Sequence, residues 1–122
     1  MPRFVILHHE MPPGGARSSH WDFMLQREDV LKTWALAEPP VAGKTTDATA
    51  LDDHRTAYLD YAGPVSGGRG SVTRWDEGTY QLVRQSEEEW VVDLAGGRLS
   101  GRVTLVRASV GGERWSFRLA AD

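Results

Sequence analysis

The most chemically informative stretch of the sequence is His20–Leu25, in which polar and apolar residues alternate (His-Trp-Asp-Phe-Met-Leu). Successive side chains of a β-strand point to opposite faces, so His20 and Asp22 must share one face with Met24. Imidazole and carboxylate groups both bind divalent metals, and two of them on one strand face can hold a cation. The other face, with two aromatic residues and a leucine, would pack into a core. The alternation therefore predicts either a metal site or a half-buried strand whose polar face is only solvated.

All four histidines of the chain, His8, His9, His20 and His54, lie in its first half. Two histidines and one carboxylate leave open positions on a metal for substrate and water. Adjacent residues of a strand point to opposite faces, so only one of His8 and His9 can reach the face of His20 and Asp22. The residues alone leave open which of the two does so. They also leave open that both are ordinary histidines at a strand end.

A second polar cluster surrounds His54. Asp53 could orient the imidazole ring and Arg55 adds positive charge, so His54 could bind phosphate or act as a general acid. Tyr58 lies four residues after His54, and its phenol could hydrogen-bond an oxyanion. The alternative is a polar turn followed by a tyrosine that serves only packing.

The elements that must position these residues are predicted to be short β-strands separated by turns. Alternating patterns and β-branched or aromatic residues mark the strands, while glycine, proline and acidic residues mark the turns. The pattern predicts a β-hairpin over 20–37. We expect strands at 4–7, 20–25, 30–37, 57–62, 71–75, 79–84, 90–94, 99–107 and 114–119.

The connections carry predictions of their own. Residues 41–57 are irregular, with at most one helical turn at 45–51. The glycine-rich stretch 63–70 lacks the Lys-Ser/Thr pair of a phosphate-binding loop, so it is expected to form turns with Arg69 on the surface. Further loops or turns are expected at 11–19, 27–29 and 76–78.

Short strands with regular turns, and no long amphipathic helix, are typical of an antiparallel barrel or sandwich. We predict a single all-β domain over residues 1–122 with at most one or two short helical turns. The tryptophans are spread along the predicted strands, which for most of them favours core layers over a platform for stacking bases. They are Trp21, Trp34, Trp75, Trp90 and Trp115.

Composition narrows the functional classes. The 122 residues are 40% hydrophobic and 25% charged, as expected for a globular domain. The absence of cysteine excludes thiol catalysis and fits a reducing compartment. No apolar run approaches the roughly 20 residues that span a bilayer, and the N-terminus shows no signal-peptide pattern, so we expect a cytoplasmic protein without membrane contact. The net charge of −3 argues against a protein that coats nucleic acid.

Taken together, these motifs resemble the 3′-phosphoesterase domain of bacterial DNA ligase D and its stand-alone relatives. The family's opening strand ends in a histidine that aligns with His9, and His20–Leu25 resembles the family's His-Tyr-Asp-Phe-Arg-Leu strand. The family's Trp-Asp-x-Gly-x-Tyr signature is matched by Trp75–Tyr80. The resemblance runs nearly end to end, through Phe4–Glu10, His20–Leu25, Leu31–Ala35, Asp53–His54 with Tyr58, Gly63–Tyr80, Leu94–Arg107 and Trp115–Asp122.

The resemblance implies a compact antiparallel β-barrel with a metal site. Carried over residue by residue, it implies His9, His20 and Asp22 as metal ligands, which selects His9 over His8. The cofactor it implies is Mn²⁺, although another divalent metal could serve.

The resemblance also implies which residues meet the substrate. His54 and Tyr58 would contact phosphate, with Arg55 beside them, and His54, Tyr58 and His20 would form the catalytic group. The implied activity is the healing of nucleic-acid 3′ ends, by removal of a terminal ribonucleoside and of a 3′-phosphate. The implied partners are nucleic-acid 3′ ends, with room for a ligase or polymerase.

The sequence departs from the family at positions that matter. Met24 stands where the family has an arginine, and methionine cannot clamp a phosphate through two hydrogen bonds. Glu38 stands where relatives carry a lysine, while Arg55 replaces a proline and restores one positive charge. The loop at 11–19 also differs from the family's spacing. We therefore favour a metal-dependent 3′-phosphoesterase, with a catalytically weak barrel that binds a metal and an anionic ligand, a nucleic-acid end or a protein as the alternative.

Overall fold

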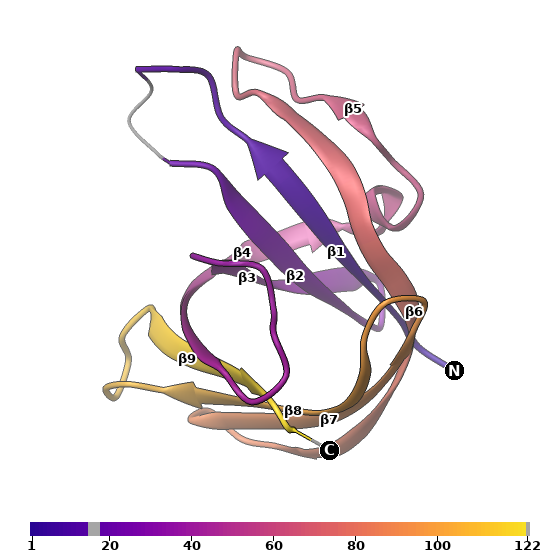
Figure 1. The fold of residues 1–122 in the computed structure, drawn as a ribbon, viewed down its shortest axis with the longest axis vertical. Helices are drawn as coiled ribbons and strands as arrows, with labels where there is room; N and C mark the ends of the chain where they lie inside the picture. The colour runs from indigo at the N-terminus through magenta and orange to yellow at the C-terminus, as the bar shows by residue number, and fades with distance from the viewer. Residues whose placement is uncertain (15–17, 122) are drawn as a thin grey trace.

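The computed structural model describes residues 1–14 and 18–121. Within these residues, eight antiparallel strands close a barrel and a ninth strand of two residues lies beside it, which confirms the predicted all-β barrel (Figure 1). The strands are β1 (Arg3–Glu10), β2 (His20–Arg27), β3 (Val30–Leu36), β4 (Thr45–Arg55), β5 (Gly63–Pro64), β6 (Ser71–Gln85), β7 (Glu89–Gly96), β8 (Ser100–Arg107) and β9 (Arg114–Leu119).

The barrel closes through β1, which pairs with β2 on one side and with β6 on the other. Around the barrel the strands follow the order β1-β2-β3-β4-β9-β8-β7-β6. Strand β6 is long because its first part pairs with β1 and its second part with β7, and Figure 1 shows it curving from one to the other. The predicted hairpin over 20–37 is confirmed as β2 and β3.

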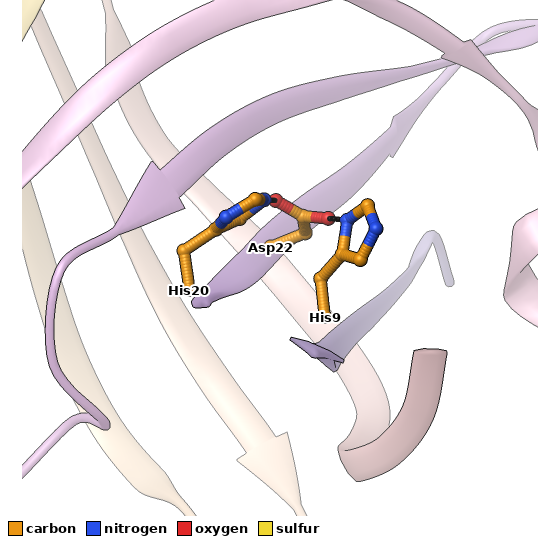
Figure 2. A group of neighbouring side chains, drawn as sticks. All are labelled: His9, His20 and Asp22. Atoms are coloured by element: carbon orange, nitrogen blue, oxygen red, sulfur yellow. Dashed lines mark hydrogen bonds and ion pairs between the residues drawn. The ribbon is translucent and has the colours of Figure 1, made fainter. Parts of the chain in front are cut away.

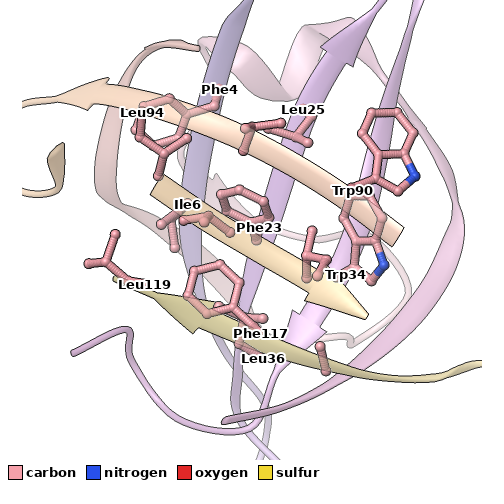
Figure 3. Close-up of a cluster of buried hydrophobic side chains, with 14 of the residues drawn as sticks. Phe4, Ile6, Phe23, Leu25, Trp34, Leu36, Trp90, Leu94, Phe117 and Leu119 are labelled. Atoms are coloured by element: carbon pink, nitrogen blue, oxygen red, sulfur yellow. The ribbon is translucent and has the colours of Figure 1, made fainter. Parts of the chain in front are cut away.

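The interior of the barrel is filled by alternate residues of nearly every strand (Figure 3). Phe23 lies at its centre, with its ring centroid 5.2 Å from that of Phe117 in an edge-to-face arrangement and 6.2 Å from that of Trp34. Leu25, two residues along β2, is fully buried in the same cluster. The apolar face predicted for His20–Leu25 is therefore the inner face of the barrel.

A second apolar cluster covers part of the outer surface of β1 and β2. It includes Leu59 from the 3₁₀ helix η1 (Thr56–Leu59), which lies over these strands. Met24 belongs to this outer cluster and is buried, so the face it shares with His20 and Asp22 is covered rather than solvated. The cluster consists of Val5, Leu7, Met24, Leu31, Leu59 and Val72.

The predictions for three segments were wrong, and two of these segments, 45–51 and 57–62, lie close together in the sequence. Residues 45–51 belong to the strand β4, because β4 pairs with β3 and β9, and its buried Ala48 lies between the exposed Asp47 and Thr49. Residues 57–62, predicted as a strand, form η1 and a turn. Leu59 is buried there between the half-buried Tyr58 and the exposed Asp60, so one inward residue produced the alternation that suggested a strand.

The turn predicted at 76–78 is also wrong, since β6 runs through it without a break. The Asp76 carboxylate is buried and accepts hydrogen bonds of 2.8 Å from the backbone N–H groups of Arg98 and Leu99. Gly78 allows β7 to approach, because a Cβ at this position would collide with the carbonyl oxygen of Ala95. Both residues resemble turn residues in sequence, but here they serve strand packing.

Most tryptophans lie in the core, as predicted. Trp34, Trp90 and Trp115 are buried, whereas Trp21 and Trp75 are partly buried against the same cluster. The loop predicted at 11–19 is supported at its two ends, and residues 15–17 of that prediction lie outside the described residues. No helix of the described chain is long and apolar enough to cross a membrane.

Candidate metal centre

The pairing of β1 with β2 brings the predicted metal ligands together. His9 lies directly opposite His20, and Leu7 lies opposite Asp22. Because side chains alternate along β1, His9 projects to the outer face with Leu7, whereas His8 stacks on Trp21 with ring centroids 4.6 Å apart. The structure therefore places His9, rather than His8, with His20 and Asp22.

These three side chains form a compact group of possible ligands, shown in Figure 2. One nitrogen from each histidine and one carboxylate oxygen lie within 4.8 Å of one another. The nearest approaches are 3.0 Å between His20 Nε2 and Asp22 Oδ1, and 3.3 Å between His9 Nδ1 and Asp22 Oδ2. The group is well shielded, since the relative exposure of His20 is 7% and that of Asp22 is 3%.

Backbone carbonyls orient both imidazole rings from behind. The carbonyl oxygen of Ser18 lies 3.0 Å from His20 Nδ1, and that of Arg69 lies 2.6 Å from His9 Nε2. Carbonyls only accept, so these two nitrogens must carry the protons. In neutral rings, His20 Nε2 and His9 Nδ1 then present lone pairs toward the Asp22 carboxylate. Ligands in metal sites are commonly fixed in this way, by a hydrogen bond from the distal ring nitrogen to a carbonyl.

The Asp22 carboxylate supports the same assignment. Burial disfavours its charged form, but the neighbouring His20 and His9 side chains, when protonated, outweigh burial and lower the pKa of Asp22 below its usual range. Among the described residues, its Oδ1 atom is buried without a hydrogen-bond partner, because the 3.0 Å contact with His20 Nε2 lacks hydrogen-bond geometry. An ionised, buried oxygen facing two imidazole nitrogens is the donor set that a divalent cation would satisfy.

The ligand group opens into a cavity of about 180 Å³, here called the metal pocket. Besides the three possible ligands, it is lined by His54 and Tyr58, so the structure brings together the two sets of residues predicted from separate motifs. The His54 and Tyr58 rings meet edge to face with centroids 5.7 Å apart. The remaining lining residues are Leu7, Met11, Met24, Leu51, Val65, Arg69 and Val72.

The orientation of His54 differs from the prediction. Its Nδ1 donates a 2.8 Å hydrogen bond to the backbone carbonyl of Asp52, not to the side chain of Asp53. Asp53 instead forms an ion pair with Lys32 at 3.2 Å. Successive side chains of β4 point to opposite faces, so Asp53, the immediate neighbour of His54, points away from the His54 ring. As for the possible ligands, a backbone carbonyl fixes the tautomer of His54. The carbonyl takes the Nδ1–H, and Nε2 is left to interact with a ligand.

Two charged positions lie outside the metal pocket. Arg55 is exposed and lines an adjoining cavity with Tyr58. Glu38 is exposed in the loop that follows β3 and lines none of the cavities described here. Met24, by contrast, lies in the wall of the metal pocket, so the departure at this position changes the pocket directly.

Arg69 was predicted only as a surface residue, and its contribution to the pocket was missed. Its carbonyl oxygen holds the His9 ring, and the residue lines the metal pocket. The neighbouring Gly70 has a positive φ of +78°, and a Cβ there would collide with the carbonyl of Glu10. Glycine is therefore required where this loop crosses the end of β1, and this was the one signal in the sequence that the loop approaches the site.

Comparison with known proteins decides the family. The sequence model of the DNA Ligase D 3′-phosphoesterase domain matches residues 13–107. The chain belongs to this phosphoesterase domain family. Its membership supports a phosphoesterase role.

The similar proteins are much longer than this chain. It is 35% identical to the multifunctional non-homologous end joining protein LigD of Mycobacterium bovis over 121 residues, covering 92% of the chain and 15% of that protein. It is 34% identical over 121 residues to the multifunctional non-homologous end joining DNA repair protein LigD of Mycobacterium tuberculosis, with the same coverage. It is 29% identical to LigD of Pseudomonas aeruginosa over 132 residues, covering 98% of the chain and 15% of that protein. The phosphoesterase domain thus spans about 15% of the relatives it matches.

Proposed function

We propose that this phosphoesterase domain is a metal-dependent enzyme that acts on nucleic-acid 3′ ends, removing a terminal ribonucleoside or a 3′-phosphate. The observation that carries the proposal is the metal pocket, where His9, His20 and Asp22 face one another beside His54 and Tyr58. Mn²⁺ is the proposed metal, and it would polarise a phosphoryl oxygen or activate water. The proposed substrates are DNA 3′ ends, with a ligase or polymerase as a partner in repair.

The side chains of the pocket divide the remaining work. With its Nδ1–H held by the Asp52 carbonyl, His54 would donate a hydrogen bond or a proton from Nε2 to a phosphoryl oxygen in its imidazolium form, in which both ring nitrogens carry protons. Tyr58 offers a phenol donor on the same wall. Burial of the ligand group excludes water and strengthens these interactions, because charges interact more strongly in a medium of low dielectric constant.

The alternative function is a barrel that binds a metal and an anionic ligand but turns substrate over slowly. The observation that favours it is Met24, a buried thioether in the wall where an arginine would supply two parallel hydrogen bonds to phosphate. Losing one stabilising donor lowers catalytic rates by roughly 10²–10³. The two functions share the metal and differ in turnover.

The deciding experiment is a 3′-end assay with Mn²⁺ on labelled primer-templates that end in a ribonucleotide or a 3′-phosphate. Wild-type protein is expected to trim both ends, and His20→Ala is expected to lower the rate at least about 100-fold. His8→Ala is the matched control, because His8 neighbours His9 in sequence but stacks on Trp21 away from the metal pocket. It should retain wild-type activity.

Absence of trimming by folded wild-type protein on both ends would rule out the enzyme and leave the binding barrel. Equal loss of activity in His20→Ala and His8→Ala would show that activity depends on strand packing and not on the proposed ligand set.

A further inference from the structure

A second cavity of about 220 Å³ adjoins the metal pocket and shares two of its walls, Tyr58 and Val65. We call it the tyrosine pocket. It lies over η1, the turn that follows it and β5. Its other lining residues are Arg55, Ala57, Tyr61, Pro64 and Ser66.

A row of three aromatic rings connects the two pockets, with Tyr58 in the middle. Tyr58 meets His54 on the side of the metal pocket and Tyr61 on the side of the tyrosine pocket, with centroids 5.7 Å and 5.9 Å apart. The Tyr58 and Tyr61 rings are perpendicular, at 89°. Tyr61 is 38% exposed, yet its hydroxyl donates a hydrogen bond to the carbonyl of Pro64, which holds the ring in place. An exposed aromatic ring that is fixed in position is suited to stacking on a planar ligand.

Arg55 gives the tyrosine pocket a cation whose charge is not neutralised. In residues 1–14 and 18–121 its side chain forms neither an ion pair nor a hydrogen bond. Two nearby carboxylates are engaged elsewhere, since Asp53 pairs with Lys32 at 3.2 Å and Asp60 with Arg3 at 3.0 Å. Arg55 therefore remains able to contact an anion. The backbone phosphate of a nucleic acid is an anion that guanidinium groups bind well.

We propose that the tyrosine pocket binds the base of the nucleotide that carries the 3′ phosphoryl group, stacked on Tyr61, while Arg55 contacts the preceding backbone phosphate. The inference rests on the proposed function, because the metal pocket must hold the phosphoryl group for its nucleotide to reach the adjoining cavity. Stacking of this kind tolerates every base, since each base has a π-face. The pocket would thus select a strand end over a free phosphate without selecting a sequence.

The test measures binding and turnover on two single-stranded DNA ends with a 3′-phosphate. One end is normal, and the other lacks only the base of the terminal nucleotide. On the normal end, Tyr61→Ala is expected to raise both the Kd and the KM about 5–100-fold, as expected for loss of one stacked base. On the baseless end, wild type and Tyr61→Ala should bind equally, and kcat should be unchanged on both ends. Tyr61→Phe keeps the ring but loses the hydrogen bond to Pro64, so its Kd should lie between those of wild type and Tyr61→Ala.

Equal weakening of both ends by Tyr61→Ala, or no weakening of either, overturns the pocket. The Kd, measured by fluorescence anisotropy with Mn²⁺, does not require turnover. Protein that binds with the expected dependence on Tyr61 but cleaves neither end would retain the base pocket and refute the proposed catalysis. Cleavage without that dependence would do the reverse.

Arg55 is tested by the salt dependence of the same Kd. Arg55→Ala should reduce the slope of log K against log salt concentration by about 0.7, the value for one phosphate contact on a single strand. Arg114→Ala is the control, because Arg114 is an exposed arginine on β9 that lines none of these cavities. Equal slopes for the two variants would remove Arg55 from the site.

Discussion

The groups that form the metal pocket reach their positions for different physical reasons. His20 and Asp22 share a face because they are two residues apart on one strand, and this geometry follows from sequence alone. The choice of His9 over His8 followed only from the resemblance, and the strand register gives it a physical cause. The carbonyls of Ser18, Asp52 and Arg69 could not be anticipated, because backbone groups carry no sequence signature.

Met24 is the residue at which a substitution should change turnover most informatively. Met24→Arg places a guanidinium on the face that carries the possible metal ligands, and we expect activity on 3′-phosphate ends to rise roughly 10²–10³-fold in kcat/KM. The same change puts a charge into the outer apolar cluster, so we expect a loss of stability of about 1–3 kcal/mol. Steady-state kinetics and urea unfolding measure the two effects.

The matched control is Met24→Lys, which adds the charge without the planar fork. A smaller gain with lysine than with arginine would identify the two-pronged contact as the cause. A Met24→Arg protein that binds Mn²⁺ normally but gains no activity would count against an underpowered esterase.

At the level of elements, the hairpin over 20–37 was predictable because its strands alternate cleanly around a polar turn. The errors arose where tertiary contacts override local signals. Asp76 and Gly78 are typical turn residues, yet in β6 one binds the backbone between β7 and β8 and the other admits β7. Strand β4 mixes three threonines with alanines and aspartates, which are uncommon in strands, and its pairing with β3 and β9 makes it a strand nonetheless.

The role of Gly78 can be tested by adding a single methyl group. Gly78→Ala would drive a Cβ against the carbonyl oxygen of Ala95, so we expect a loss of about 1–3 kcal/mol in the free energy of unfolding. Gly97→Ala is the control, since a Cβ there meets only Asp76 Oδ1 at 3.5 Å, and its effect should stay within about 0.5 kcal/mol. Similar losses for both glycines would show that the approach of β7 is not the constraint.

For the molecule as a whole, the metal is proposed to act on stability as well as on chemistry. All three possible ligands belong to the closed barrel, where they lie within 4.8 Å of one another. An unfolded chain does not hold them in that arrangement, so a cation that binds the native state should stabilise the entire domain.

Thermal unfolding with and without Mn²⁺ measures this coupling. At a metal concentration about 100 times Kd, the native state should gain about 2.7 kcal/mol, which corresponds to a rise of roughly 10 °C in Tm for a chain of this length. His20→Ala should lose the rise and His8→Ala should keep it. An unchanged Tm of wild-type protein at saturating Mn²⁺ would contradict both the enzyme and the metal-binding alternative.

Closure of the barrel by β1 and β6 also sets the order in which the chain can fold. The pairing of β1 with β2 joins near neighbours in sequence, whereas the pairing of β1 with β6 joins Arg3 to Thr79. Contacts between distant parts of a chain form slowly, because the entropy of the intervening loop must be lost first. His9, His20 and Asp22 all lie on the near-neighbour pair, so they can meet before the barrel closes. The carbonyl of Arg69 reaches His9 only when β6 arrives, which makes orientation of that ring a late event in folding.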